Sequence, residues 1–173
     1  MKTFLTIFIT ALMIVPELLC GNLGMSPGLP LYTAIYFAGA FGLFYGVTAA
    51  GFAGLLLDLL YARPYLWTAL IWALITFAAF ECSMRLRMRS PEAPIVAGIT
   101  AGVLQLLWSV FYVLVTAHPL PGPDIFSMLV FDLTGGGIFM LLTVLLFDAI
   151  NFRCNLPRFS PPENANQHRG GQI

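Results

Sequence analysis

The sequence predicts an all-α integral membrane protein, a bundle of six transmembrane helices with almost no soluble mass outside the bilayer. Of its 173 residues, 59% are hydrophobic and 9% are charged, against about 25% charged in an average soluble domain. So few charges are too few to coat a soluble domain of this size, whereas a surface that faces lipid needs no such coat. The net charge is zero, so no electrostatic field recruits nucleic acid.

The second observation is a series of apolar segments close to the roughly 20 residues that a membrane-spanning helix needs. Short linkers separate them, and Gly and Pro are concentrated in two of these linkers. The polar tail, 153–173, is predicted to be a disordered cytoplasmic segment. The spans form one transmembrane domain over 1–152 and are predicted at 3–20, 31–46, 48–62, 65–82, 93–117 and 125–152.

The first span follows Lys2, and its alternative interpretation is a cleaved signal peptide. Residues 18–21 are similar to a lipoprotein cleavage site. However, Leu19 stands where such sites have a small residue, and Glu17 lies inside the apolar run. We therefore expect this segment to be retained as a span.

The second and third spans share one apolar stretch, 31–61. As a single helix it would be roughly 46 Å long at 1.5 Å per residue, which exceeds a hydrocarbon core of about 30 Å even with tilt. Gly42, Gly46 and Gly51 lie near its middle, where a helix can break. The stretch is therefore divided into two short spans.

The basic residues favour an even number of spans. With six spans and a cytoplasmic N-terminus, seven of the eight basic residues lie in the cytoplasm and only Arg63 lies outside. With five spans, Lys2 and the arginine cluster 85–89 would face opposite sides. We therefore expect both termini in the cytoplasm.

Acidic residues inside the spans are the candidates for chemistry, because a charge at mid-membrane costs roughly 2.5–3.5 kcal/mol on insertion scales. Three of them have structural interpretations. Glu17 lies near the outer end of the first span. Glu81 precedes Arg85 by one helical turn. Asp148 lies near the cytoplasmic end of the last span, with Arg153 close by.

Asp58 is harder to explain in this way. On a helix, Gly51, Gly54 and Asp58 share one face, and the two glycines allow another helix to approach closely. The carboxylate is therefore expected in a helix contact rather than in lipid. There it would accept a hydrogen bond from a neighbouring helix or pair with Arg63.

Asp132 lies two turns inside the last span and precedes a glycine triplet. Each glycine weakens a helix by about 1 kcal/mol relative to alanine, so the triplet predicts a kink, a break or close packing. For both aspartates the interpretations are interhelical packing or a proton- or ligand-linked site. The candidate helix-packing or partner-binding residues are Gly51, Gly54, Asp58, Asp132, Gly135, Gly136 and Gly137.

Signatures of catalysis and of metal or cofactor binding are absent from the sequence. His118 and His168 have no Cys or Glu at ligand spacing, and the three cysteines suit neither a metal site nor a disulfide. The chain has no Gly-x-Ser-x-Gly, no phosphate-binding glycine loop and no His-Glu-x-x-His. We therefore predict no enzyme, no catalytic residue, no cofactor and no metal.

The segment from Pro30 to Leu70 resembles the core of the MreD family, the rod shape-determining membrane proteins of bacteria. Pro30 opens the second span, and Gly51-Phe-x-x-Gly-Leu-x-x-Asp58 followed by Pro64 matches the family's most recognisable stretch. The chain has Leu66 and Trp67 where the family usually has a glycine.

This resemblance implies a non-enzymatic scaffold of the cell-elongation machinery, which directs lateral peptidoglycan synthesis at the bacterial cytoplasmic (inner) membrane. The implied principal partner is an MreC-like protein, with MreB, RodA and a class B penicillin-binding transpeptidase as further partners within the lipid bilayer. In overall plan the family is also similar to the substrate-binding subunit of energy-coupling-factor transporters. A vitamin-type binding subunit is therefore the alternative, and an ion-coupled transporter that uses Asp58 and Asp132 is a second one.

Overall fold

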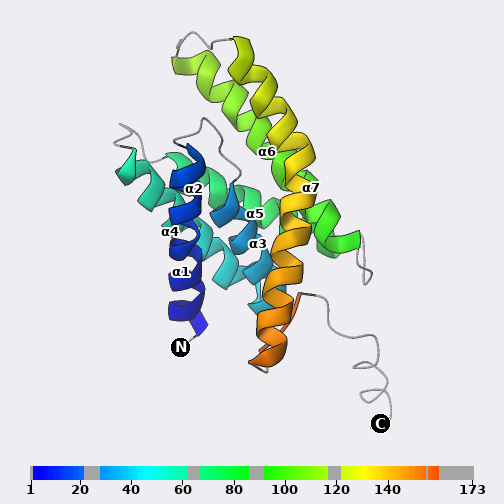
Figure 1. Ribbon diagram of the computed structural model, residues 1–173. Coiled ribbons are helices and arrows are strands. Elements are labelled where there is room, and N and C mark those ends of the chain that lie inside the picture. Colours follow the sequence, from blue (N-terminus) through cyan, green and yellow to red (C-terminus); the bar gives the residue numbers. More distant parts are fainter. Residues whose placement is uncertain are drawn as a thin grey trace.

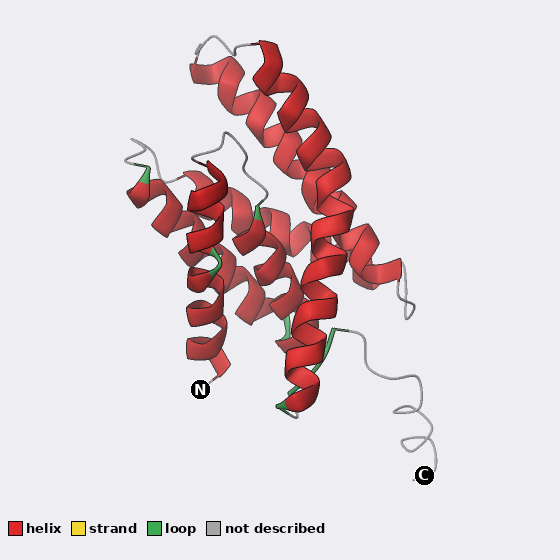
Figure 2. Ribbon diagram, in the orientation of Figure 1, coloured by secondary structure: helices red, strands yellow, loops and turns green. Residues whose placement is uncertain are grey.

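The computed structural model describes residues 2–21, 28–61, 67–85, 92–116, 122–154 and 156–159. Within these ranges every regular element is an α-helix (Figure 2), which confirms the predicted all-α class. The helices are α1 (Lys2–Leu12), α2 (Ile14–Gly21), α3 (Leu29–Phe41), α4 (Leu43–Leu60), α5 (Trp67–Arg85), α6 (Glu92–Thr116) and α7 (Gly122–Arg153).

Five segments of the described chain are long and apolar enough to cross a membrane, and they mark the protein as a membrane protein. The short helix α3 is apolar too, but its 13 residues span only about 20 Å at 1.5 Å per residue. A sixth crossing therefore depends on α3. The five longer segments are Thr3–Cys20, Leu43–Leu60, Trp67–Met84, Glu92–Phe111 and Gly136–Arg153.

Helices α1 and α2 form the first predicted span, with an interruption at Met13. Pro16 explains the interruption, because its nitrogen has no hydrogen to donate to the carbonyl four residues earlier. Helical hydrogen bonds still lead into and out of the joint, from the Met13 nitrogen to the Ile9 oxygen (3.1 Å) and from the Glu17 nitrogen to the Met13 oxygen (3.4 Å). The two helices therefore continue along one line (Figure 1).

The long apolar stretch is divided at Gly42 rather than at residue 47. Gly42 has a φ of 112°, a conformation that side-chain-bearing residues rarely adopt, and it alone joins α3 to α4. Gly46, expected as a possible break, is instead a packing residue. A Cβ there would overlap with Ala38 and lie 2.6 Å from the carbonyl oxygen of Ala34. The two helices thus form a tight antiparallel hairpin.

Helix α3 is the centre of the bundle and contacts all the other helices that the structure describes. Its residues 30–38 are all buried, as expected for a helix that is apolar on every side. Tyr36, Phe37 and Phe147 form an aromatic group between α3 and α7, with ring centroids 5.4–5.8 Å apart. The start of α1 and the end of α7 lie at the same end of the molecule (Figure 1), which we call the terminal end.

The glycine triplet neither kinks nor breaks α7, which is continuous over 32 residues. Of the three structural expectations, close packing is the one that the structure shows. A Cβ on Gly136 would lie 2.6 Å from the carbonyl oxygen of Gly98 and 3.3 Å from the Cα of Gly102. The backbones of α6 and α7 therefore touch at this point, as small residues allow in membrane helix pairs.

Candidate functional site

Asp58 is fully buried and accepts a hydrogen bond from the backbone nitrogen of Thr68, 3.0 Å from its Oδ2. Thr68 is the second residue of α5, and the first N–H groups of a helix have no acceptor within the helix. The negative carboxylate also lies at the positive end of the helix dipole. Asp58 of α4 thus caps α5. Arg63, the other expected partner, lies outside the described residues.

Gly54 brings the two backbones together beside this cap. A Cβ on Gly54 would lie 2.7 Å from both the nitrogen and the Cα of Ala69, whereas a Cβ on Gly51 would lie no closer than 3.9 Å to the Ala69 oxygen. The face that the helical spacing assigns to these residues is therefore filled by α5 of the same chain. For Gly54 and Asp58, the geometry supports helix packing.

Glu17 makes a matching contact at the start of α3. The side chain is 2% exposed, its Oε1 accepts the N–H of Gly28 at 3.1 Å, and its Oε2 accepts the N–H of Leu29 at 2.9 Å. Sequence reasoning placed Glu17 near the outer end of its span but assigned it no partner. One sequence signal was available: Glu17 is an acid near the end of one apolar helix, about ten residues before the start of the next. A similar spacing separates Asp58 from Thr68.

Gln105 of α6 lies beside the Glu17 cap and was missed by the sequence analysis. It is 8% exposed, and among the described residues its Oε1 has no hydrogen-bond partner. A Cβ on Gly28 would lie 3.0 Å from this oxygen. A buried polar atom in this state is unusual, so Gln105 is a candidate binding residue.

Three polar side chains meet near the terminal end. The Tyr36 hydroxyl of α3 donates to Oδ1 of Asp148 at 2.7 Å, and the Asn151 amide donates to the Tyr36 oxygen at 2.9 Å. These pairs are 112 and 115 residues apart in the sequence, which is why no local pattern reveals them. Asp148 thus bonds to α3, and it bonds as well to the segment described next.

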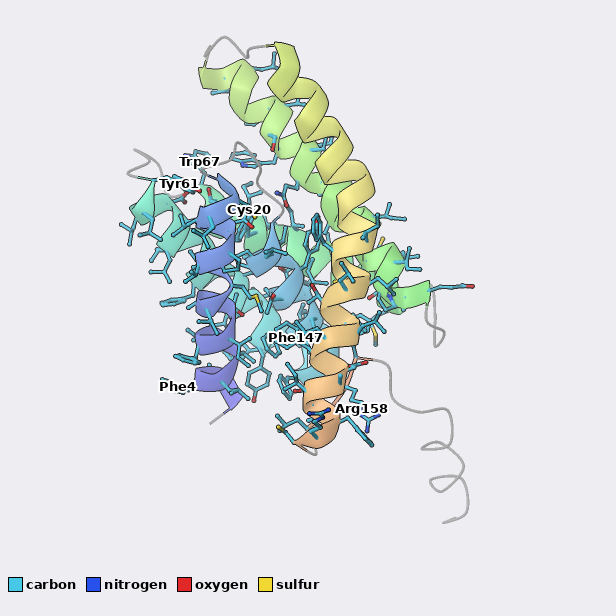
Figure 3. The ribbon with its side chains drawn as sticks, in the orientation of Figure 1. Phe4, Cys20, Tyr61, Trp67, Phe147 and Arg158 are labelled. Atoms are coloured by element: carbon cyan, nitrogen blue, oxygen red, sulfur yellow. The ribbon has the colours of Figure 1, made fainter. Side chains whose placement is uncertain are left out.

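Residues 156–159 fold back on this group. The N–H of Phe159 donates to Oδ1 of Asp148 at 3.0 Å, and the Asn151 amide donates to the carbonyl oxygen of Pro157 at 2.9 Å. Arg158 lies beside the final turns of α7 (Figure 3), with its guanidinium 4.2 Å from the centroid of the Phe152 ring. The disorder predicted from residue 153 onward does not extend to these four residues, because Asp148 and Asn151 bind their backbone.

The remaining predicted site residues lie along α7. The side chain of Asp132 and the surroundings of Gly135 are outside the described part, so Asp132 is not placed relative to Asp58. A Cβ on Gly137 would meet a side-chain atom of Ile99 at 3.6 Å, an ordinary contact. Within the described ranges, His, Cys, Asp and Glu side chains form no group of three that could hold a metal ion.

The fold and these contacts define a class of protein: a helical membrane bundle whose buried carboxylates bind the N-termini of its own helices. Comparisons of the chain with protein-family models, with curated proteins and with solved structures found no match.

Proposed function

We propose that this protein is a non-enzymatic scaffold of the bacterial inner membrane, which binds partner membrane proteins of the cell-elongation machinery through its helix faces. The observation that carries the proposal is the use of its buried acids. Glu17 and Asp58 accept backbone hydrogen bonds at the starts of α3 and α5. They hold the bundle in one arrangement, which is what a docking platform requires. The resemblance of the Gly51–Asp58 motif to MreD supports the same role.

The proposed topology has six crossings, with α3 as a short crossing and both termini in the cytoplasm. Two observations support it. The start of α1 and the end of α7 lie at one end of the molecule (Figure 1), and Arg153 and Arg158 lie there too, as the positive-inside tendency favours. A reporter fused after Arg89 tests the topology, and a periplasmic signal from that reporter would contradict it.

The proposed partners are an MreC-like protein first, then MreB, RodA and a class B penicillin-binding transpeptidase. Because α5 fills the Gly54–Asp58 face, we propose that these partners bind other faces, and that this face serves them by fixing the fold. The test is complementation of a rod-shaped bacterium depleted of its MreD, with co-purification of the MreC-like partner. We expect the wild-type chain and Gly51→Ala to restore rods and retain the partner, and Gly54→Leu to do neither.

Failure of the wild-type chain in both assays, in the species from which it comes, would overturn the scaffold proposal. Loss with Gly51→Ala but not with Gly54→Leu would contradict the assigned role of the face. Protein levels in the membrane, measured by immunoblot, separate loss of fold from loss of binding.

The second candidate is a small-molecule binding subunit of a membrane transporter, of the vitamin-binding type. The specific observation in its favour is Gln105, whose buried oxygen has no hydrogen-bond partner among the described residues. A thermal-shift screen against vitamins tests this function. A stabilising ligand whose effect disappears in Gln105→Leu would support it, and no shift with any vitamin would argue against it.

A further inference from the structure

We infer that α3 and α7 form a peptide-binding site near the terminal end of the molecule, and that residues 156–159 of the same chain occupy it. The site takes a short segment with a proline, a basic residue and an aromatic residue in succession. A cytoplasmic segment of a partner membrane protein with this chemistry can therefore replace the chain's own segment. The proposal extends the scaffold function by naming a binding surface, but the site itself does not depend on that function.

Helix α7 binds main-chain atoms of the segment 156–159. Asp148 accepts the N–H of Phe159 at 3.0 Å, and Asn151 donates to the carbonyl oxygen of Pro157 at 2.9 Å. The two α7 side chains are three residues apart, so they lie on one side of the helix. Together they bind an acceptor and a donor of a single peptide segment, and main-chain hydrogen bonds are the usual source of affinity in such sites.

The site is organised by contacts that do not involve its occupant. The hydroxyl of Tyr36 donates to Asp148 at 2.7 Å and accepts from Asn151 at 2.9 Å. Both recognising side chains are therefore oriented by α3, the central helix of the bundle. A site that is fixed in advance loses less conformational freedom when it binds.

The aromatic side chain of the segment packs against α3. The ring of Phe159 stacks on the ring of Tyr36, with centroids 6.1 Å apart and an interplanar angle of 23°. It also lies directly against Gly39, where any Cβ would overlap with the ring. The basic residue has a place of its own, because the Arg158 guanidinium lies over Phe152, a favourable cation–π arrangement.

Residues 156–159 are covalently attached to the site through α7. This attachment controls their competition with any other peptide for the site. A segment that follows α7 directly acts at an effective concentration in the millimolar range. It therefore excludes a free peptide of the same sequence from the wild-type protein. A partner displaces it when the partner is itself held beside the bundle by contacts in the membrane.

The experiment uses the full-length protein in detergent and a fluorescein-labelled synthetic peptide, Asn-Leu-Pro-Arg-Phe-Ser, which copies residues 155–160. Phe159→Ala removes the aromatic group from the resident segment and leaves the site intact. By fluorescence anisotropy, we expect this variant to bind the peptide at least about ten-fold more tightly than the wild-type protein, which its own segment blocks. The matched control peptide has Ala in place of Phe and should bind at least about ten-fold more weakly.

A second variant and a second measurement make the outcome decisive. Gly39→Leu, added to Phe159→Ala, places a large side chain where the Phe159 ring packs in the wild type. This double variant should therefore not bind the peptide. Trypsin cleavage after Arg158, followed by mass spectrometry, reports whether the resident segment is released, and it should be faster in Phe159→Ala than in wild type. Three results would each overturn the proposal: equal binding of the two peptides, no peptide binding by Phe159→Ala, or the same rate of trypsin cleavage in Phe159→Ala and wild type. None of these results depends on cell-shape complementation, so the scaffold proposal fails or stands separately.

Discussion

Glu17 and Asp58 are structural counterparts: each is a buried carboxylate that accepts backbone hydrogen bonds at the start of the next helix along the chain. Glu17 binds the N–H groups of Gly28 and Leu29, and Asp58 binds that of Thr68. A buried N–H group without an acceptor costs about 1–3 kcal/mol. The two acids therefore allow α3 and α5 to begin in the buried part of the bundle.

Replacing Asp58 with alanine should lower the free energy of unfolding by about 1–3 kcal/mol, because the N–H of Thr68 loses its acceptor. Asp58→Asn should lose less, since its amide oxygen still accepts. Denaturant unfolding in detergent, followed by tryptophan fluorescence, measures both. Thr48→Ala is a control, because the Thr48 hydroxyl bonds only within its own helix, to Phe44. An Asn variant as unstable as the Ala variant would show that the charge, not the acceptor, is required.

Glu17→Ala should lower the free energy of unfolding by about 2–4 kcal/mol, because two N–H groups lose their acceptors. Glu17→Gln should recover part of the loss, since its one carbonyl oxygen replaces one of the two acceptors. The same unfolding assay compares the series. Equal losses in Glu17→Ala and Glu17→Gln would contradict the role of the two oxygens as acceptors.

Gly54→Ala should destabilise the protein by about 1–3 kcal/mol, because the added methyl group forces α4 and α5 apart. Gly51→Ala, one turn away on the same helix, is the matched control. It has room for the methyl group and should be neutral or more stable by up to about 1 kcal/mol, from helix propensity alone. Equal effects of the two substitutions would argue against close approach at Gly54.

The adjacent glycines of α7 give a second matched pair. Gly136→Ala should weaken the contact of α6 with α7 and cost about 1–3 kcal/mol, whereas Gly137→Ala meets only an ordinary contact with Ile99. Proteolytic sensitivity of the α6–α7 pair, together with the unfolding assay, checks this. A destabilising Gly137→Ala with a neutral Gly136→Ala would mean that α7 is rotated relative to the arrangement described here.

Gly39→Ala and Phe159→Ala should not be additive. In the wild-type background the new methyl group collides with the Phe159 ring, so Gly39→Ala should be destabilising. Once the ring is removed, the same substitution should be neutral or favourable through helix propensity. A double-mutant cycle of unfolding free energies should give a coupling of at least about 0.5 kcal/mol. Additive effects would show that the ring does not rest on Gly39.

Helical spacing and composition predicted the features that depend on residues close together in the sequence or on small residues such as glycine. The apolar runs predict the helices, and the spacing of Gly54 and Asp58 predicts a shared face, which the structure places against α5. Close packing was one of the outcomes predicted for the glycine triplet, and Gly136 lies against Gly98 and Gly102.

Two features were beyond such reasoning. The helix breaks at Gly42, whereas Gly46 packs against Ala38. The sequence does not distinguish a glycine that ends a helix from a glycine that packs against a neighbouring helix. The bonds among Tyr36, Asp148 and Asn151 join distant parts of the chain. Helices that are apolar on every side carry no periodic signal for the face that meets a neighbour.

The one-residue connection at Gly42 also bears on biosynthesis. When α3 leaves the ribosome it is too short to be released into the bilayer as a separate span, and no polar loop follows it before α4. We therefore expect the two helices to enter the bilayer together as a hairpin, held by the contact of Gly46 with Ala38. The nearest charge before this hairpin, Glu17, and the charge within it, Asp58, are both acidic, so we expect its orientation to follow the more distant Lys2 and Arg63.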